Sequence, residues 1–112
     1  MNVEALSQLQ RIQGVQGAAV LRRNGDVVQS SFGHGTEGEV TGALAAAVFG
    51  LIGQSIEHMD IGGLSNCMFE GNTGAVYMLG TGEHVLLVVT AKQANMGLIR
   101  LGLQRVATSL RS

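Results

Sequence analysis

Apolar residues recur at helical spacing at both ends of the chain. Near the start, this pattern predicts a helix over residues 2–13, which Asn2 would cap and Gly14 would end. Its apolar face consists of Leu6, Leu9 and Ile12. Near the end, the same spacing predicts a helix over residues 95–110, capped by Asn95. Its apolar face consists of Met96, Ile99, Leu103, Val106 and Leu110.

A β-hairpin follows the first helix. Residues 17–23 and 27–32 are both rich in β-forming residues, and Asn24-Gly25-Asp26 lies between them. Asn-Gly adopts the positive backbone angles that a two-residue hairpin turn requires. The pattern therefore predicts two antiparallel strands joined by this turn.

The middle of the chain predicts one long helix, from about residue 37 to residue 59. Thr36, followed three residues later by Glu39, has capping-box spacing. Small residues fill the helix interior: Gly42, Ala43, Ala45, Ala46, Ala47, Gly50 and Gly53. Each glycine in a helix costs about 1 kcal/mol relative to alanine, so these residues indicate a closely packed neighbour. That neighbour is either the protein's own sheet or the same helix of a second subunit, and the pattern leaves both open.

Three further strands are predicted over residues 64–70, 75–79 and 84–91, separated by glycine-containing turns. The run Val85–Val89 is apolar at every position, which is typical of a strand covered on both faces. The element order is α-β-β-α-β-β-β-α. The expected fold is therefore α/β (α+β), an antiparallel sheet of five strands with helices on both sides, forming one domain over residues 1–112.

Composition narrows the classes of function. Apolar residues make up 46% of the chain and charged residues only 13%, about half the usual share, which favours a surface buried by another chain. The formal net charge is −1, so no basic footprint for nucleic acid is expected. The apolar stretch 40–53 is too short to span a bilayer, and no signal peptide is recognisable. With Cys67 as the single cysteine, we expect a cytoplasmic protein without disulfides.

Candidate catalytic residues are few. Cys67 could act as a nucleophile with a histidine as its base, but a position in mid-strand favours a small buried hydrophobe. His34, His58 and His84 have no metal-ligand spacing, so we expect no metal site. We therefore expect no catalytic residue, no cofactor and no enzymatic activity.

Two other groups of residues could bind phosphate. The glycine-rich segment 33–38 precedes a helix, where a phosphate could bind, but it lacks the GK[ST] ending of a P-loop. Arg22 and Arg23 are the only adjacent arginines, and Arg100 and Arg105 share the last predicted helix. Ordinary loop and surface roles are expected for both groups.

Three segments resemble the roadblock/dynein light chain 7 (roadblock/LC7) family. Residues 12–18 (IQGVQGA) resemble its entry from the first helix into the first strand, residues 24–28 (NGDVV) its hairpin turn, and residues 94–100 (ANMGLIR) the start of its last helix. The resemblance implies a five-stranded sheet with the long helix on one face and the other two on the opposite face. It also implies dimers in which the third strands pair and the second helices lie side by side.

The same resemblance implies a function. Bacterial members of this kind, such as gliding-motility regulators, bind a small Ras-like GTPase and modulate its nucleotide cycle without supplying an arginine finger. Mapped onto this chain, the self-dimer interface would comprise Gly42, Ala46, Gly50, Gly53, Leu64, Asn66, Met68 and Glu70. Candidate residues for contact with the GTPase are Gln54, Glu57 and His58.

Other interpretations stay open from the sequence. The protein could be a purely structural dimer that tethers a larger complex, or a PAS-like sensory domain that binds a small ligand in its interior. A hydrolase is a more distant alternative, because no nucleophile stands in a recognisable setting. The expected partners are a second copy and a small Ras-like GTPase, and neither nucleic-acid binding nor membrane insertion is expected.

Overall fold

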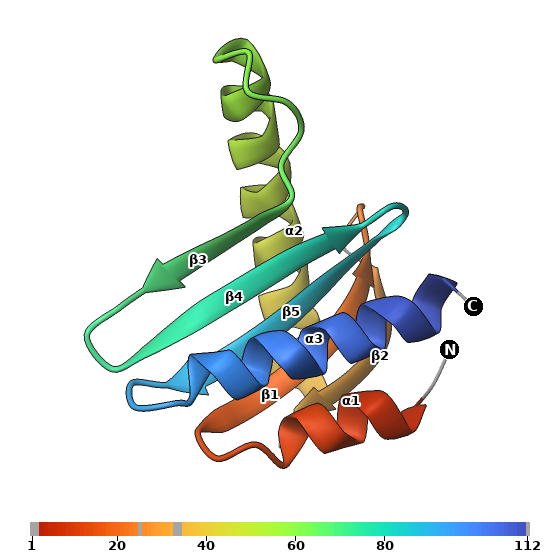
Figure 1. Ribbon diagram of the computed structural model, residues 1–112, viewed down its shortest axis with the longest axis vertical. Helices are drawn as coiled ribbons and strands as arrows, with labels where there is room; N and C mark the ends of the chain where they lie inside the picture. The colour runs from red at the N-terminus through yellow and green to blue at the C-terminus, as the bar shows by residue number, and fades with distance from the viewer. Residues whose placement is uncertain (1–2, 25, 33–34, 112) are drawn as a thin grey trace.

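The computed structural model describes residues 3–24, 26–32 and 35–111, and it describes side chains over residues 6–24, 26–30 and 44–109. Its elements follow the predicted order (Figure 1). They are α1 (Val3–Gln10), β1 (Val15–Arg22), β2 (Val27–Phe32), α2 (Gly35–His58), β3 (Asn66–Glu70), β4 (Gly74–Thr81), β5 (His84–Ala91) and α3 (Met96–Arg111).

The five strands form one antiparallel sheet in the order β2-β1-β5-β4-β3. β5 lies at its centre, between β1 and β4. Residues 85–88 of β5 are each no more than 1% exposed, which confirms that this strand is covered on both faces. β2 and β3 are the two edges of the sheet.

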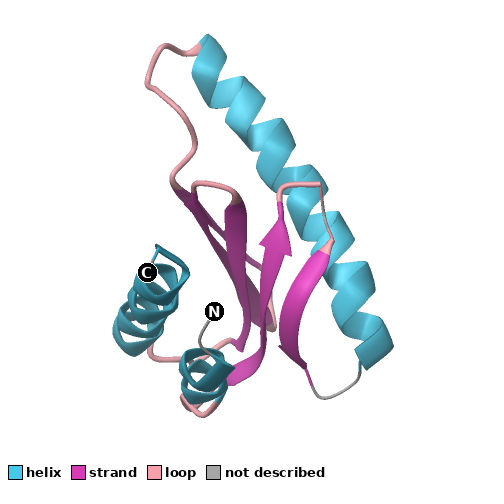
Figure 2. Ribbon diagram, turned by 90° about the vertical axis from the view of Figure 1, so that its right-hand side faces the viewer, coloured by secondary structure: helices cyan, strands magenta, loops and turns pink. Residues whose placement is uncertain are grey.

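Helices cover the two faces of the sheet unequally. Figure 2 shows α2 on one face and the pair α1 and α3 on the other. Successive side chains of a strand point to opposite faces, so β1 and β5 each contribute to two cores. Ala18, Val20, Leu86 and Val88 pack toward α1 and α3. Ala19, Leu21, Val85 and Leu87 pack toward α2.

The sequence predicts that Gly14 ends the first helix and that Asn95 caps the last; the second prediction is confirmed, whereas α1 ends at Gln10, four residues before Gly14. Gly14 has a φ of +93°, and a Cβ there would lie 2.7 Å from the Cβ of Ala94, so glycine is required after α1. The Oδ1 of Asn95 accepts a hydrogen bond of 3.1 Å from the backbone N–H of Leu98, which confirms that Asn95 caps α3. The Asn2 cap lies outside the described residues.

Element boundaries shift where tertiary contacts compete with local preference. α1 ends at Gln10, and residues 11–12 continue as a tighter turn with N–H groups bonded three residues back. β1 begins at Val15 because that residue already pairs with Thr90 of β5. β3 begins at Asn66, so Leu64 lies in the preceding loop. α2 begins at Gly35, one residue before the expected cap Thr36, whose side chain is outside the described part.

The second helix is longer than the sheet that it covers. Its 24 residues correspond to about 36 Å at 1.5 Å per residue. Figures 1 and 2 show its C-terminal turns continuing past the β3 edge, so that they overhang the sheet. A loop then returns from this end of the helix to β3.

Candidate functional site

α2 has two apolar sides, and only one of them packs against the sheet. Ala45, Ala46 and Phe49 face inward and are at most 7% exposed. The outward stripe comprises Leu44, Val48 and Leu51, which are 65%, 38% and 66% exposed. These positions lie four and then three residues apart, so the three side chains share one face of the helix. An exposed apolar stripe of this kind is typical of a surface that another molecule covers.

The edge strand β3 lies beside this stripe. β3 pairs with β4 on one side only, so its outer edge presents unpaired backbone groups. Two of its side chains, Met68 and Phe69, are 45% and 40% exposed. The strand contains no proline or lysine that would block pairing with another strand.

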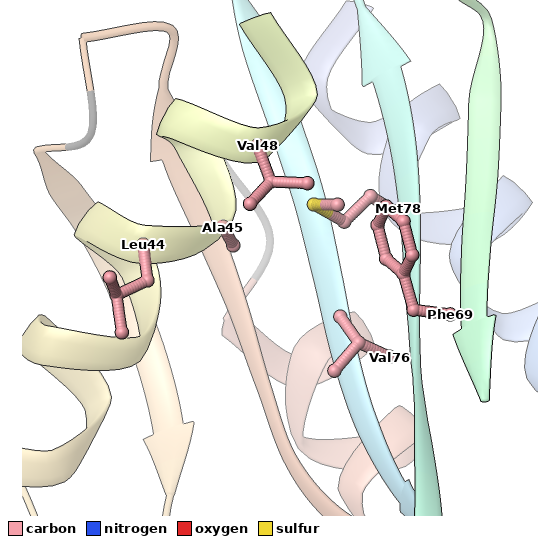
Figure 3. Close-up of a pocket in the computed structure, with 6 residues that line it drawn as sticks. All are labelled: Leu44, Ala45, Val48, Phe69, Val76 and Met78. Atoms are coloured by element: carbon pink, nitrogen blue, oxygen red, sulfur yellow. The ribbon is translucent and has the colours of Figure 1, made fainter. Parts of the chain in front are cut away.

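A hollow of about 260 Å³ opens between α2 and the strands β3 and β4. Figure 3 shows that side chains from all three elements surround it. Its lining is apolar: Leu44, Ala45, Val48, Phe69, Val76 and Met78. The outward stripe of α2, the hollow and β3 therefore form one continuous exposed surface, named here the α2–β3 surface.

The overhanging end of α2 carries the predicted partner-binding residues. Gln54, Glu57 and His58 are all exposed, and the Nδ1 of His58 lies 3.0 Å from the carbonyl oxygen of Gln54. Met59 and Ile61, in the loop that follows, are 67% and 68% exposed. This end of the molecule thus combines polar and apolar side chains that the protomer itself does not cover.

The predicted interface residues of α2 have different surroundings. No atom outside the helix lies within 4 Å of a Cβ built at Gly50, which is exposed. A Cβ at Gly53 would lie 3.7 Å from the Cβ of Leu64, which is an ordinary contact distance, so the loop before β3 leaves room for a side chain here. Ala46 packs inward against the protomer's own sheet. Gly42 lies in α2, where the structure does not describe side-chain surroundings.

The predicted interface residues of β3 lie together on the edge strand. Asn66, Met68 and Glu70 alternate along it, and all three are exposed. Their cross-strand neighbours Tyr77 and Leu79 pack in the core beneath α1 and α3, so these three side chains point to the sheet face opposite α2. Sequence reasoning missed Leu44, Val48, Leu51 and Phe69. The helical spacing of Leu44, Val48 and Leu51 is visible in the sequence. Because α2 is apolar on most sides, however, the sequence does not show which of its apolar residues face outward.

Cys67 is a half-buried residue of β3 that packs against the core beneath α2. Burial raises the pKa of its thiol, because desolvation disfavours the thiolate. It stands opposite Met78, whereas His84 stands opposite Thr81, so the strand register keeps these two residues apart. His34 lies outside the described residues.

Two of the arginines have structural contacts. The Nε of Arg23 donates a hydrogen bond of 2.7 Å to the carbonyl oxygen of Gly82, and its guanidinium lies 5.7 Å from the ring centre of Phe49. Arg100 lies at the same distance over Tyr77. Within the described residues, no cluster of three His, Cys, Asp or Glu could hold a metal ion. No described helix is long and apolar enough to cross a membrane.

Residues 1–91 match the model of the Roadblock/LC7 domain family. The chain belongs to the roadblock/LC7 family. Its relatives include an uncharacterised protein of Methanocaldococcus jannaschii that is 34% identical over 107 residues, which cover 96% of this chain and 91% of that protein. A second uncharacterised protein of the same organism is 32% identical, with 96% and 94% covered.

Solved roadblock/LC7 structures share the whole fold. The roadblock/LC7 domain from Streptomyces avermitilis matches with a TM-score of 0.88 at 20% identity, covering 96% of this chain and 92% of that chain. MglB from Myxococcus xanthus matches with a TM-score of 0.84 at 18% identity and the same coverage. A structure described as MglB with a tetrameric arrangement matches at 0.82 and 22% identity, covering 96% and 83%. These likenesses extend beyond residue 91 and so include α3.

Proposed function

We propose that the protein is a homodimeric, non-enzymatic binding module that regulates or scaffolds a small Ras-like GTPase. The observation that carries the proposal is the α2–β3 surface, where an unpaired strand edge and an outward apolar stripe adjoin. Family membership supports the same conclusion, because the roadblock/LC7 resemblance implies both the dimer and the GTPase.

In the proposed dimer, a two-fold axis relates two copies of the α2–β3 surface. Each β3 becomes the neighbouring strand that the other β3 lacks, and the two sheets join into one. The outward stripes of Leu44, Val48 and Leu51 then meet, and apolar side chains of the second copy enter the hollow between α2 and β3. The overhang of α2 past the β3 edge (Figure 1) supports this geometry, because in such a dimer the end of the helix would lie over the second sheet.

The GTPase would bind where the two second helices expose polar side chains. Gln54, Glu57 and His58 lie at the overhanging end of α2, and each is exposed. Binding alters the switch regions of a GTPase only if the two nucleotide states are bound with different affinity. We therefore expect the module to prefer one nucleotide state.

A binding role agrees with the chemistry of Cys67. A raised pKa keeps the thiol protonated near neutral pH, and the protonated thiol is a poor nucleophile. We assign this residue to packing beneath α2, and we assign no catalytic residue to the chain.

The proposal is tested by pull-down with a Ras-like GTPase from the same organism, loaded with GDP or with a non-hydrolysable GTP analogue. We expect retention of one nucleotide state and loss of at least about tenfold in affinity for Glu57→Lys. Glu83→Lys is the matched control, because Glu83 is also exposed but lies in the β4–β5 turn. Absence of binding in both states, or equal loss in the two variants, would overturn the proposal.

A hydrolysis assay separates regulation from tethering. The GTPase is incubated with and without the dimer, and the released phosphate is measured. A changed rate assigns the protein to regulation of the nucleotide cycle. An unchanged rate with intact binding assigns it to the structural role of holding the GTPase in a larger complex.

A further inference from the structure

Charge is unevenly distributed between the two ends of the chain and its middle. Residues 1–16 and 91–112 contain five basic residues and one acidic residue, whereas residues 17–90 contain two basic and seven acidic residues. The first set comprises α1, α3, their adjoining loops and the adjacent ends of β1 and β5, and the two helices cover one face of the sheet (Figure 2). Among the residues whose side chains the structure describes, this layer, named here the α1–α3 face, holds four basic residues and no acidic one: Arg11, Lys92, Arg100 and Arg105.

A partly apolar groove runs between the two helices of this face. It encloses about 140 Å³. Leu98 and Leu101 of α3 stand at its side and are 50% and 55% exposed. Leu9 and Ile12 of α1 also line it, and Gly102 lets α1 approach, since a Cβ there would lie 2.7 Å from the Cδ1 of Leu9.

Basic side chains stand beside the apolar ones. Arg105 lines the groove, and Arg11 follows α1 on the same face; both are exposed. Arg100 is exposed on α3, with its guanidinium above the ring of Tyr77. The face thus presents leucines for burial together with cations that attract carboxylates.

We propose that the α1–α3 face is a second docking surface, and that its occupant is an amphipathic helix of a partner protein with acidic residues beside its apolar stripe. Helices dock into grooves of this kind through apolar side chains spaced three and four residues apart. Leu98 and Leu101 would contact that stripe, and Arg11 and Arg105 would face the carboxylates.

The charge of the face favours this occupant over a second copy. Two α1–α3 faces brought together would place like charges opposite one another, which opposes association. The recessed shape of the groove favours an inserted helix over a bilayer, because the apolar side chains Leu9 and Ile12 lie inside it. A membrane and self-association therefore enter as outcomes of the test.

A second docking surface would extend the proposed function. The α1–α3 face and the α2–β3 surface lie on opposite sides of the sheet (Figure 2). A partner helix on the first does not compete with a dimer formed through the second. A homodimer would then have two sites that each bind an acidic helix of a partner, in addition to the surface that binds the GTPase.

The experiment measures binding of a fluorescent synthetic peptide of about 18 residues, five helical turns, with leucines at helical spacing and glutamates between them. A second peptide carries lysines in place of the glutamates. Vesicles of phosphatidylcholine, with and without phosphatidylserine, are tested in parallel, and light scattering reports the mass of the protein. The variants are Leu98→Ser with Leu101→Ser, and Arg105→Glu. Arg22→Glu is the matched control, because Arg22 is exposed at the end of β1.

We expect the acidic peptide to bind at least about tenfold more tightly than the basic one, and each test variant to weaken it by at least about fivefold. Arg22→Glu should change the affinity by less than about twofold. If a variant unfolds, the binding site is mapped instead by the amide chemical shifts of the unmutated protein when the acidic peptide is added. Changes confined to α1 and α3 support the proposal, and changes at α2 or β3 contradict it. The proposal would be overturned if the two peptides bound equally or not at all, or if the protein bound only to phosphatidylserine vesicles. It would also be overturned if light scattering showed self-association that the Leu98 and Leu101 changes abolish.

Discussion

At the scale of single residues, space around the backbone decides several positions. Gly74 begins β4 opposite Ala91 of β5, and a Cβ built there would collide with the carbonyl oxygen of Thr90. At Gly63, in the loop before β3, a Cβ would meet no other atom within 4 Å. The two glycines therefore have different reasons to be glycine, although the sequence presents both as turn residues.

Gly74→Ala is expected to lower the free energy of unfolding by about 1–3 kcal/mol, because the backbone of β5 must move to admit the methyl group. Urea denaturation measures this change. The control is Gly63→Ala, for which we expect no loss and a gain of up to about 1 kcal/mol from reduced freedom of the unfolded chain. A loss of similar size in both variants would contradict the steric argument.

At the scale of elements, the capping residue of α3 and the packing of its apolar face both favour the same helix. Asn95 caps its first turn, while Ile99, Leu103 and Val106 are at most 1% exposed against the sheet. α2 shows the opposite case, since its local pattern is apolar on two sides and does not say which side faces the sheet.

Asn95→Ala removes the acceptor for the N–H of Leu98 and is expected to lower the free energy of unfolding by about 1 kcal/mol. Thermal or urea unfolding followed by circular dichroism measures it. Gln104→Ala, at an exposed position in the middle of the same helix, should change stability by less than about 0.5 kcal/mol. Equal effects would show that the cap contributes nothing to the stability of α3.

At the scale of the whole molecule, the low content of charge has a structural explanation. Most of the large apolar residues that are exposed in the described part of the chain lie on the α2–β3 surface or beside the α1–α3 groove. A patch on each side of the sheet is consistent with a small protein that works by being covered on both sides.

Leu51→Glu is expected to raise the dissociation constant of the proposed dimer by at least about tenfold, because the carboxylate would be buried between two helices. Light scattering at micromolar concentration should give twice 11.7 kDa for the unmutated chain and a lower mass for the variant. Leu101→Glu is the matched control: it changes a comparably exposed leucine on the opposite face and should leave the mass unchanged. A monomeric unmutated protein would exclude the dimer.

The sequence by itself determined the element order, the hairpin at residues 24–26, the cap at Asn95 and the central place of the run 85–89. These features depend on local geometry or on a residue type that fits only one environment, so a short window is sufficient to recognise them. Only the tertiary structure decided which side of α2 faces the sheet, that a Cβ would collide with a neighbouring strand at Gly74 but not at Gly63, and that basic residues far apart in the chain share one layer of the molecule. These properties arise from the packing of distant segments, which a linear pattern of polarity does not specify.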